Sequence, residues 1–332
     1  PEHQGFDLNL GGCGKGTPPS YFSPYKLPNL PDGPEGEYLT DRLTSEAIHF
    51  IEQNREKPFL VYLSHYAVHN PLQAKPALLE KYKAKAAKLP AGGSPEFLDD
   101  NGRAVRQVQN NPAYAAMVEN LDDNVGRILD KLAELKLDEN TIVIFTSDNG
   151  GLSTAEGSPT SNLPLRAGKG WAYEGGVREP LLIKWPGVTK PDSICNKPVS
   201  SPDFFPTILA MAGLLPLPQQ HLDGTSIVPE LQGTDSPERS IFWHYPHYSN
   251  QGGSPYGAVR LGDFKLIEWY EDMRVELYDL RNDIAEKNNL ATDKPETAAA
   301  LTTRLHVWRA DVKAQMPQPN TPYDPTNLTI SK

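Results

Sequence analysis

The chain of 332 residues contains little cysteine and no long apolar run. Its two cysteines, Cys13 and Cys195, lie in unrelated contexts, which excludes a disulfide framework and a cysteine-based metal site. No apolar run approaches the length of a membrane span, so a spanning helix is excluded as well. The stretch from Pro1 to Gln4 has no basic segment followed by an apolar core, so we expect no signal peptide within this sequence.

The chain also lacks an excess of basic residues. It contains 32 Lys and Arg against 42 Asp and Glu, which gives a formal net charge of −10. A nucleic acid or an anionic membrane is therefore not expected as its main partner. Proline is abundant, with 32 residues, but aromatic and aliphatic residues are interleaved throughout, which indicates long ordered surface loops. The length fits one large α/β domain or two smaller ones.

The chain is organised around one stretch, residues 141–151. Its first half, 141–146, is apolar and β-branched, which predicts a strand buried on both faces, as in a parallel sheet. Asp148, Asn149 and two glycines follow, and function collects beyond the carboxyl ends of strands in such sheets. A carboxylate beside an amide, on a backbone that is free to bend, suits a hard cation such as Ca²⁺ or Mg²⁺. An ordinary turn also explains these residues.

Helices and strands alternate along most of the chain, as in βαβ units. Helical spacing of apolar residues predicts helices at 40–54, 113–135 and 202–212, and a Lys- and Ala-rich helix near 76–88 inside an insertion at 72–111. Further buried strands are predicted at 58–63 and 181–185. Beyond residue 240, short strands separated by turns predict an antiparallel sheet, with strands at 241–243, 256–261, 265–268 and 275–277, a closing helix at 298–314 and a polar tail.

Four blocks in this order resemble type I sulfatases of the formylglycine-dependent, arylsulfatase-like group. They are YLSHYAVHNP at 62–71, FTSDNGG at 145–151, RAGKGWAYEGGVREP at 166–180, and GDFKLI with ELYDL at 262–267 and 276–280. The resemblance covers nearly the whole chain. It implies an alkaline-phosphatase-like α/β sandwich with a mainly parallel central sheet, incomplete at its N-terminal side, and a small C-terminal antiparallel sheet packed with a helix. We expect an N-terminally truncated α/β domain over 1–235 and a C-terminal subdomain over 236–332.

The resemblance also implies roles for four residues. Asp148 and Asn149 would be ligands of one Ca²⁺, and His69 and Lys169 would contact a sulfate ester. A sulfate ester needs positive groups on its non-bridging oxygens and a proton donor near the leaving oxygen. Taken alone, His69 is equally well explained as a hydrogen-bonding loop residue, and a lone surface lysine is usually solvated.

A second group of candidates lies at 243–248, WHYPHY. His244 and His247 with the neighbouring aromatic residues can line a sugar-binding pocket, because aromatic faces stack on sugars and imidazoles bond hydroxyls. A packed aromatic loop explains the same residues equally well. Arg178 and Glu174 are expected to form a structural ion pair beside the glycines.

Three parts of the family pattern are missing. The Cys/Ser-x-Pro/Ala-x-Arg motif that carries the formylglycine is absent, as are an Asp-Asp pair of the calcium site and a Gly-Lys-Trp-His block. In the family all three lie upstream of the residues that match 4–7. Two protein ligands fall short of the six to eight oxygens that Ca²⁺ prefers. We therefore expect a missing N-terminal segment to carry the formylglycine and complete the calcium site, and the isolated chain to be inactive.

The leading interpretation is a sulfuric ester hydrolase that removes sulfate from a sulfated carbohydrate of the galactose or galactosamine type. A phosphatase or phosphodiesterase of the same superfamily is an alternative, although Asn149 stands where those relatives usually have a second-metal histidine. A third interpretation is that the chain is a non-catalytic remnant that still binds sugar. Because sulfatases of this group are generally exported, we expect a periplasmic or secreted location, or a lysosomal one in a eukaryote.

Overall fold

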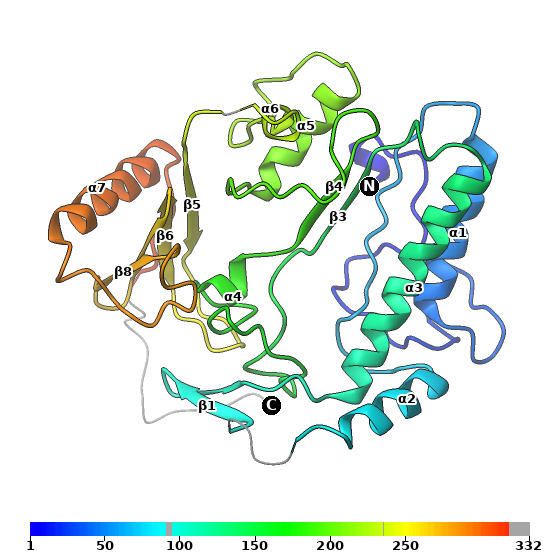
Figure 1. Cartoon of the computed structure of the whole chain (residues 1–332), viewed down its shortest axis with the longest axis horizontal. Helices are drawn as coiled ribbons and strands as arrows, with labels where there is room; N and C mark the ends of the chain where they lie inside the picture. Colours follow the sequence, from blue (N-terminus) through cyan, green and yellow to red (C-terminus); the bar gives the residue numbers. More distant parts are fainter. Residues whose placement is uncertain (91–94, 235, 319–332) are drawn as a thin grey trace. The chain divides into compact units, whose positions relative to one another are not determined.

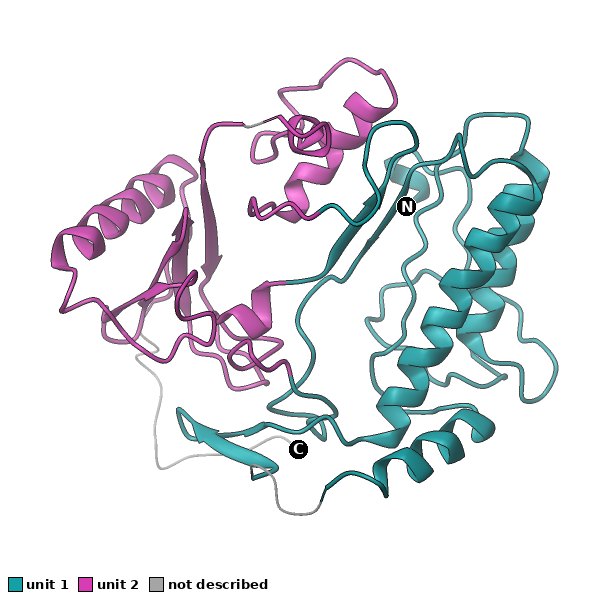
Figure 2. Ribbon diagram, in the orientation of Figure 1, with its two compact units in different colours: residues 1–161, 179–193 teal, residues 162–178, 194–332 magenta. Residues whose placement is uncertain are grey.

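The computed structural model describes residues 1–90, 95–234 and 236–318. They form two compact units (Figures 1 and 2): unit 1 comprises 1–161 and 179–193, and unit 2 comprises 162–178 and 194–332. Residues 162–178 and 194–235 thus cluster with the C-terminal sheet, whereas the predicted domain boundary at 235/236 stays a prediction. Within the described ranges no helix has the length and apolarity to cross a membrane.

Unit 1 contains three long helices close to the predicted positions. They are α1 (Leu39–Asn54), α2 (Pro76–Ala86) and α3 (Pro112–Glu134), preceded by the short 3-10 helix η1 (Glu2–Gln4). The helix α3 begins where the sequence provides a cap, because the Asn111 side chain accepts hydrogen bonds from the backbone N–H groups of Ala113 and Tyr114 at 3.0 and 3.2 Å. A proline at its first position completes this start signal.

The helices α1 and α3 are joined by a polar contact and an apolar core. Asp41 of α1 accepts hydrogen bonds from Asn120 and Asn124 of α3 at 2.9 and 2.8 Å, and from Lys75 at 2.7 Å. Burial opposes ionisation, but these donors hold the pKa of Asp41 below its usual value. Beside them, the apolar core gathers Leu39, Leu43 and Met117 with residues of the N-terminal loop, namely Tyr21, Tyr25, Leu27, Leu30 and Tyr38.

The strands of unit 1 form two separate antiparallel pairs. The pair β1 (Phe97–Asp100) and β2 (Arg103–Arg106) is a hairpin inside the insertion at 72–111, where no strand was predicted. The strand β3 (Val143–Thr146) pairs with β4 (Leu181–Lys184), and Phe145 lies opposite Leu182. The prediction that 141–146 is buried on both faces is wrong, because Phe145 is 37% exposed and Leu182 is 60% exposed. Among the described residues, strand pairing covers only one edge of β3.

The predicted strand at 58–63 pairs with no other strand among the described residues. The prediction that it is buried is wrong as well, since Leu60 is 58% exposed and Tyr62 is 78% exposed. All strand pairs that the described residues form are antiparallel, so no parallel pair of the expected central sheet is present among them.

Unit 2 contains the predicted antiparallel sheet. Its strands follow the chain order β5 (Ser240–Tyr245), β6 (Tyr256–Leu261), β7 (Phe264–Trp269) and β8 (Val275–Asp279). The closing helix α7 (Pro295–Asp311) covers one face, where Leu301 and Leu305 pack with Val259, Leu266 and Leu277. The other face packs on Trp171 and Tyr173 of the segment that contains the short helix α4 (Glu174–Val177). Both faces are therefore buried.

The remaining elements of unit 2 lie between these parts in the chain. They are η2 (Ser201–Asp203), α5 (Phe204–Met211) and α6 (Val228–Leu231). The helix α5, with η2 before it, confirms the predicted helix at 202–212, whereas α6 was not predicted. Gly213 follows α5 with φ +68°, the left-handed conformation that ends many helices. The predicted polar tail falls largely on 319–332, which lies outside the described residues.

Candidate functional site

The loop after β3 holds Asp148 and Asn149 side by side. The Asn149 amide donates a hydrogen bond to the Asp148 carboxylate, and the Ser147 hydroxyl donates to the Asn149 carbonyl at 3.1 Å. The Asp148 residue is exposed and Asn149 is half-buried. The two residues thus present a carboxylate and an amide at the carboxyl end of a strand, as the sequence predicted.

The structure adds Glu179 to this loop. Because Thr146 lies opposite Leu181 in the antiparallel pair, the residue that leaves β3 and the residues that enter β4 are neighbours. Burial, together with the negative charge of Asp148, raises the pKa of Glu179 to about 7. Its Oε1 atom is buried and has no hydrogen-bond partner in the described part of the chain.

These three residues fit part of a site for a hard cation. They supply oxygen donors, two carboxylates repel one another, and one buried carboxylate oxygen lacks a partner. They do not make a whole site, since the described residues contain no cluster of three or more His, Cys, Asp or Glu that could hold a metal. Sequence reasoning missed Glu179, because the sequence does not show the pairing of β3 with β4 that brings it to this loop.

His69 lies in a loop of unit 1 that is held at several points. Its ring Nδ1 lies 3.1 Å from the Asn70 carbonyl, and its own carbonyl accepts a hydrogen bond from the Tyr21 hydroxyl at 2.9 Å. The Asn70 side chain donates to the Glu156 carbonyl at 3.1 Å. Glu156 belongs to the loop that follows Asn149, so the histidine loop is tied to the segment after β3.

Lys169 lies in unit 2, on a loop that is fixed by its neighbours. Gly170 has φ +83°, and a Cβ at this position would lie 2.3 Å from the Ser249 hydroxyl, so only glycine fits. The indole N–H of Trp171 donates to the Gln251 carbonyl at 3.0 Å, and the Trp171 side chain is buried. Lys169 itself is half-buried. Its backbone is therefore fixed by close packing on the 249–251 loop.

The same loop is anchored on its other side by Arg166. The guanidinium carbon lies 3.8 Å from the centroid of the Tyr173 ring, which is a cation–π contact. The guanidinium also donates to the Glu286 carbonyl at 2.9 Å and to the Tyr278 hydroxyl at 3.2 Å. The segment that carries Lys169 is thus held to the antiparallel sheet at both ends.

A buried ion cluster lies beneath this segment. Lys265 of β7 is fully buried and contacts Glu174 at 2.9 Å and Glu286 at 3.0 Å. The predicted pair of Arg178 and Glu174 is present at 3.6 Å, but Lys265 is the nearer cation. Burial opposes ionisation of Glu174, yet Lys265 holds its pKa below the usual value, whereas burial raises the pKa of Glu286. Sequence reasoning missed Lys265 and Glu286 because they lie about a hundred residues from Glu174.

The two candidate sugar-binding histidines have different environments. His244 lies on β5, and its two ring nitrogens contact the Tyr270 hydroxyl at 2.7 Å and the Gln315 carbonyl at 2.9 Å. The His247 ring lies 4.0 Å from the Tyr245 ring. Tyr248, beside them, is 68% exposed. The engaged nitrogens of His244 favour a packing role, and sugar binding by His244 and His247 stays a prediction.

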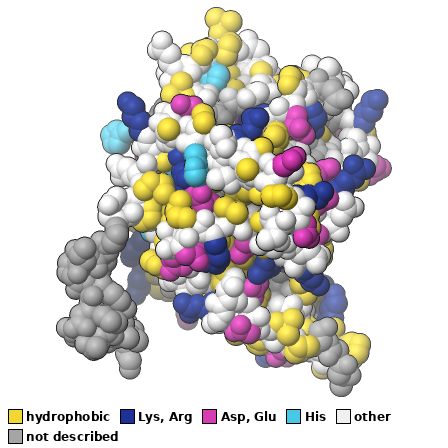
Figure 3. Space-filling model, turned by 90° about the vertical axis from the view of Figure 1, so that its left-hand side faces the viewer, with side chains coloured by type: hydrophobic (Ala, Val, Ile, Leu, Met, Phe, Trp, Pro, Cys, Tyr) yellow, Lys and Arg dark blue, Asp and Glu magenta, His cyan; other side chains and the backbone are white. Residues whose placement is uncertain are grey.

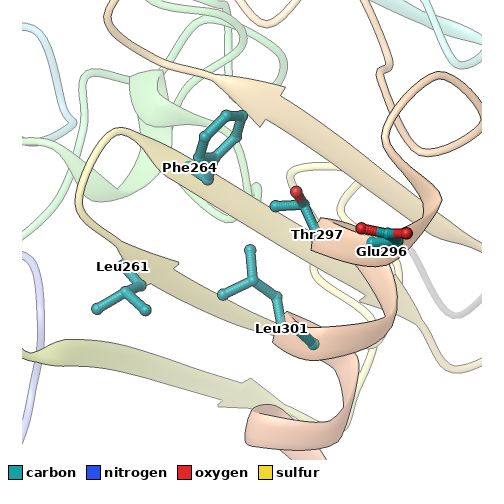
Figure 4. Close-up of a pocket in the computed structure, with 6 residues that line it drawn as sticks. Leu261, Phe264, Glu296, Thr297 and Leu301 are labelled. Atoms are coloured by element: carbon teal, nitrogen blue, oxygen red, sulfur yellow. The ribbon is translucent and has the colours of Figure 1, made fainter.

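Two small hollows in unit 2 contain none of the candidate residues. The first, between the β6–β7 hairpin and α7, has a volume of about 340 Å³ (Figure 4) and is lined by Leu261, Phe264, Glu296, Thr297, Ala300 and Leu301. The second, also of about 340 Å³, lies against α5 and is lined by Pro206, Ala210, Leu214, Pro216, His221, Gly224, Thr225 and Ser226. Figure 3 shows basic and acidic side chains interspersed on one face, without a large area of one sign.

Comparison with known proteins identifies the family. A family model described as Sulfatase matches residues 3–214, and one described as N-sulphoglucosamine sulphohydrolase, C-terminal, matches residues 167–313. The chain belongs to the sulfatase family. The first match contains His69, Asp148, Asn149 and Lys169, and the second begins just before Lys169 and includes the antiparallel sheet and α7.

Individual relatives agree with this assignment. A sulfatase of Formosa agariphila is 36% identical over 315 residues, which are 86% of this chain and 53% of that protein. The N-acetylgalactosamine-6-sulfatase of Canis lupus familiaris is 31% identical over 278 residues, 76% of this chain and 47% of that protein. The sulfatase chain spans about half the length of these curated relatives.

A solved structure confirms the predicted fold class. The crystal structure of Ps i-CgsB in complex with k-i-k-neocarrahexaose matches with a TM-score of 0.67 and 29% identity. The match covers 88% of this chain and 60% of that chain. The mixed helices and strands and the four-stranded C-terminal sheet are therefore those of a sulfatase.

The first prediction concerns Lys265. Replacing it in Lys265→Met removes the only buried cation that contacts both Glu174 and Glu286 in the described part of the chain, so the free energy of unfolding should fall by about 3–5 kcal/mol. Urea denaturation measures this change. Lys287→Met, at an exposed position next to Glu286, is the control and should change stability by less than about 0.5 kcal/mol. Equal stability of Lys265→Met and the unsubstituted chain would contradict the structural role of the cluster.

The second prediction concerns the pH dependence of stability. The pKa of Glu179 is raised from 4.5 to about 7, so the folded state holds its proton more tightly than the unfolded state. The stability that the protonated Glu179 carboxyl contributes is fully present below pH 4.5 and is lost as the pH rises through 7. In the unsubstituted chain the free energy of unfolding should therefore fall between pH 4.5 and 7, and in Glu179→Gln this fall should be absent. Above pH 7, Glu179→Gln should be more stable than the unsubstituted chain.

Urea denaturation at pH 5 and pH 8, in buffer without divalent cations, measures this difference. Glu139→Gln, at an exposed position shortly before β3, serves as the control and should keep the pH dependence of the unsubstituted chain. If Glu179→Gln loses as much stability between the two pH values as the unsubstituted chain, the raised pKa of Glu179, which burial and the charge of Asp148 cause, is contradicted.

Proposed function

We propose that this chain is the body of a sulfuric ester hydrolase that removes sulfate from a sulfated carbohydrate. The observation that carries the proposal is the sulfatase match over residues 3–214, which contains His69, Asp148, Asn149 and Lys169 in the blocks that resemble the family. Hydrolysis of a sulfate ester requires charge on the non-bridging oxygens to be neutralised and the leaving oxygen to be protonated. The four residues offer groups for both requirements.

In this proposal Lys169 binds the non-bridging sulfate oxygens. An ammonium group supplies a point charge and three N–H donors, which suits an anion with tetrahedral oxygens. Its backbone is fixed by Gly170 and by the hydrogen bond of Trp171 to Gln251. A fixed backbone reduces the conformational freedom that substrate binding has to remove, so the lysine can be positioned with less loss of entropy.

His69 donates the proton to the leaving oxygen in the same proposal. The Asn70 carbonyl only accepts hydrogen bonds, so its contact at 3.1 Å requires the proton on Nδ1 of His69. Donation therefore requires the imidazolium form, in which Nδ1–H stays on the Asn70 carbonyl and the Nε2 proton passes to the leaving oxygen as the S–O bond breaks, which leaves the neutral ring. The hydrogen bond from Tyr21 to the His69 carbonyl fixes the backbone that orients this ring.

Asp148 and Asn149 hold one Ca²⁺ in this proposal, and the negative charge of Glu179 adds to the field at that end of β3. The bound calcium and a formylglycine on a polypeptide segment outside this chain would supply charge neutralisation and the nucleophile. Two features support a segment of this kind. The chain lacks the formylglycine motif, and it spans about half of its curated relatives.

The proposed substrate is a sulfated sugar of the galactose or galactosamine type. One relative is named N-acetylgalactosamine-6-sulfatase, and the structure of Ps i-CgsB contains a neocarrahexaose. Because the net charge of this chain is −10, a polyanionic substrate has to be recognised by local groups and not by overall attraction. His247 and the exposed Tyr248 are candidates for the sugar rings. A periplasmic, secreted or lysosomal location is part of this proposal.

The third prediction tests the function in the complete enzyme, with galactose 6-sulfate and N-acetylgalactosamine 6-sulfate as substrates. Lys169→Ala and His69→Ala should each lower kcat/KM by about 10²–10⁴-fold, because each removes a group that acts in the transition state. Lys190→Ala, an exposed lysine after β4, should leave kcat/KM unchanged. Sulfate release is measured by ion chromatography.

Three outcomes would refute the proposal. The first is sulfate release by the isolated chain without any added segment, and the second is full activity of Lys169→Ala in the complete enzyme. The third is the absence of turnover with every sulfated sugar despite sugar binding, which would favour the non-catalytic sugar-binding remnant.

A further inference from the structure

Arg106, at the end of β2 in unit 1, is a largely buried arginine. Its side chain is 11% exposed, and its guanidinium contacts the Glu96 carboxylate at 2.7 Å and the Asn110 side chain. The guanidinium carbon lies 4.9 Å from the centroid of the Phe97 ring, which is a cation–π contact. The β1–β2 hairpin is therefore built around one end of this guanidinium, whereas the Nε atom donates to a group outside the hairpin.

That group belongs to the loop 153–158, which follows Asp148 in the chain. The Nε atom of Arg106 donates a hydrogen bond to the Ser158 carbonyl. The backbone N–H of Arg106 donates to the Ser153 carbonyl at 2.9 Å. One residue of the insertion at 72–111 thus holds both ends of this loop, by its side chain at one end and by its backbone at the other.

The loop 153–158 has a backbone conformation that needs such support. Glu156, Gly157 and Ser158 have φ of +53°, +87° and +41°, so three consecutive residues are left-handed and two of them carry side chains. A left-handed backbone is unfavourable for residues other than glycine, and it persists only where surrounding contacts impose it. Ser158 is buried, and its carbonyl is the group that Arg106 binds. Arg106 therefore helps to impose this conformation.

Glu156 connects the same loop to the candidate proton donor. Its carbonyl accepts a hydrogen bond from the Asn70 side chain at 3.1 Å. The Nδ1 atom of His69 lies 3.1 Å from the Asn70 carbonyl, which also accepts a hydrogen bond from the Thr17 hydroxyl. A continuous path of contacts inside unit 1 therefore leads from Arg106 to the His69 ring. Because Thr17 also holds Asn70, loss of the Glu156 contact should displace the ring only in part.

We propose that Arg106 is a positioning residue for the sulfatase reaction, which orients the His69 ring through the loop 153–158 and Asn70. The inference rests on the proposed function, in which His69 protonates the leaving oxygen. The ring has to present Nε2 to that oxygen, and the hydrogen bond from Nδ1 to the Asn70 carbonyl sets this orientation. Proton transfer requires the donor within hydrogen-bond distance, so a displaced ring slows the chemical step. The insertion thus contributes to catalysis without contact with the substrate.

The fourth prediction compares Arg106→Met with Arg103→Met in the complete enzyme, with the two sulfated sugars named above. Arg106→Met should lower kcat by about tenfold and change KM by less than about twofold, because His69 acts in the transition state whereas Lys169 binds sulfate in the ground state. Arg103 lies on the same strand at an exposed position, so Arg103→Met should leave both constants unchanged. Circular dichroism and the melting temperature show whether each variant is folded.

A double-mutant cycle separates positioning from general stability. Asn70→Ala removes the side chain that bonds the loop but keeps the carbonyl that contacts His69, so it should also lower kcat by about tenfold. The variant with both substitutions should be no slower than the slower single variant, because both interrupt one path. Losses that multiply to about a hundredfold would show independent effects and overturn the inference. If Arg106→Met does not fold, Asn70→Ala decides alone, and an unchanged kcat in it overturns the inference.

The tautomer of His69 gives a readout that does not depend on turnover. Nuclear magnetic resonance of the complete enzyme with isotope-labelled histidine should place the proton of the neutral ring on Nδ1, and Arg106→Met should move part of this population to Nε2. Arg103→Met should give the spectrum of the unsubstituted enzyme. The expected shift in an enzyme that releases no sulfate would support the path from Arg106 to His69 and refute the proposed function. Sulfate release with an unchanged tautomer and an unchanged kcat in Arg106→Met would do the reverse.

Discussion

Asp148 and Glu179 are two carboxylates that the antiparallel pairing of β3 and β4 forces to be neighbours. The register puts Thr146 opposite Leu181, so the side chains just beyond this pair emerge at the same end. Burial and mutual repulsion raise the pKa of Glu179 to about 7, which shows that the fold alone does not compensate this charge. The proposed cation site and the role proposed for the loop after β3 both depend on this constraint.

Unit 2 holds buried carboxylates in a different way. Glu174 and Glu286 share the fully buried Lys265, and Arg260 and Arg178 lie within 4 Å of Glu174. Here the charges are compensated inside the fold, and the result is a rigid support for the segment that carries Lys169. The contrast is informative, because uncompensated buried charge points to a ligand, whereas compensated charge points to structure.

The sequence predicted local structure well and long-range structure poorly. The helix at 113–135 and the strands at 256–261 and 265–268 follow from apolar periodicity and turn residues, which are properties of neighbouring positions. The contact of Lys265 with Glu174 joins residues 91 positions apart, and no local pattern encodes such a pairing. From the sequence alone, a buried lysine in a strand cannot be distinguished from an ordinary surface lysine.

The same limit explains the error at 58–63 and why the sequence pointed to only some of the residues at the candidate site. Apolar residues on both faces indicated a buried strand, but burial requires a neighbour that the sequence of this segment cannot specify. Asp148 and Asn149 were found because they are adjacent in the chain. Glu179 was missed because only the register of β3 and β4 places it near them.

The most direct test of the central claim is a titration of thermal stability with Ca²⁺ at constant ionic strength. Ca²⁺ should raise the melting temperature of the complete enzyme, in which the outside segment completes the site, with a gain of about 1.4 kcal/mol in unfolding free energy at ten times the Kd. The substitution Asp148→Asn should abolish this gain. An unchanged melting temperature across the titration, or an equal rise in Asp148→Asn, would contradict the assignment of this strand end as part of a cation site.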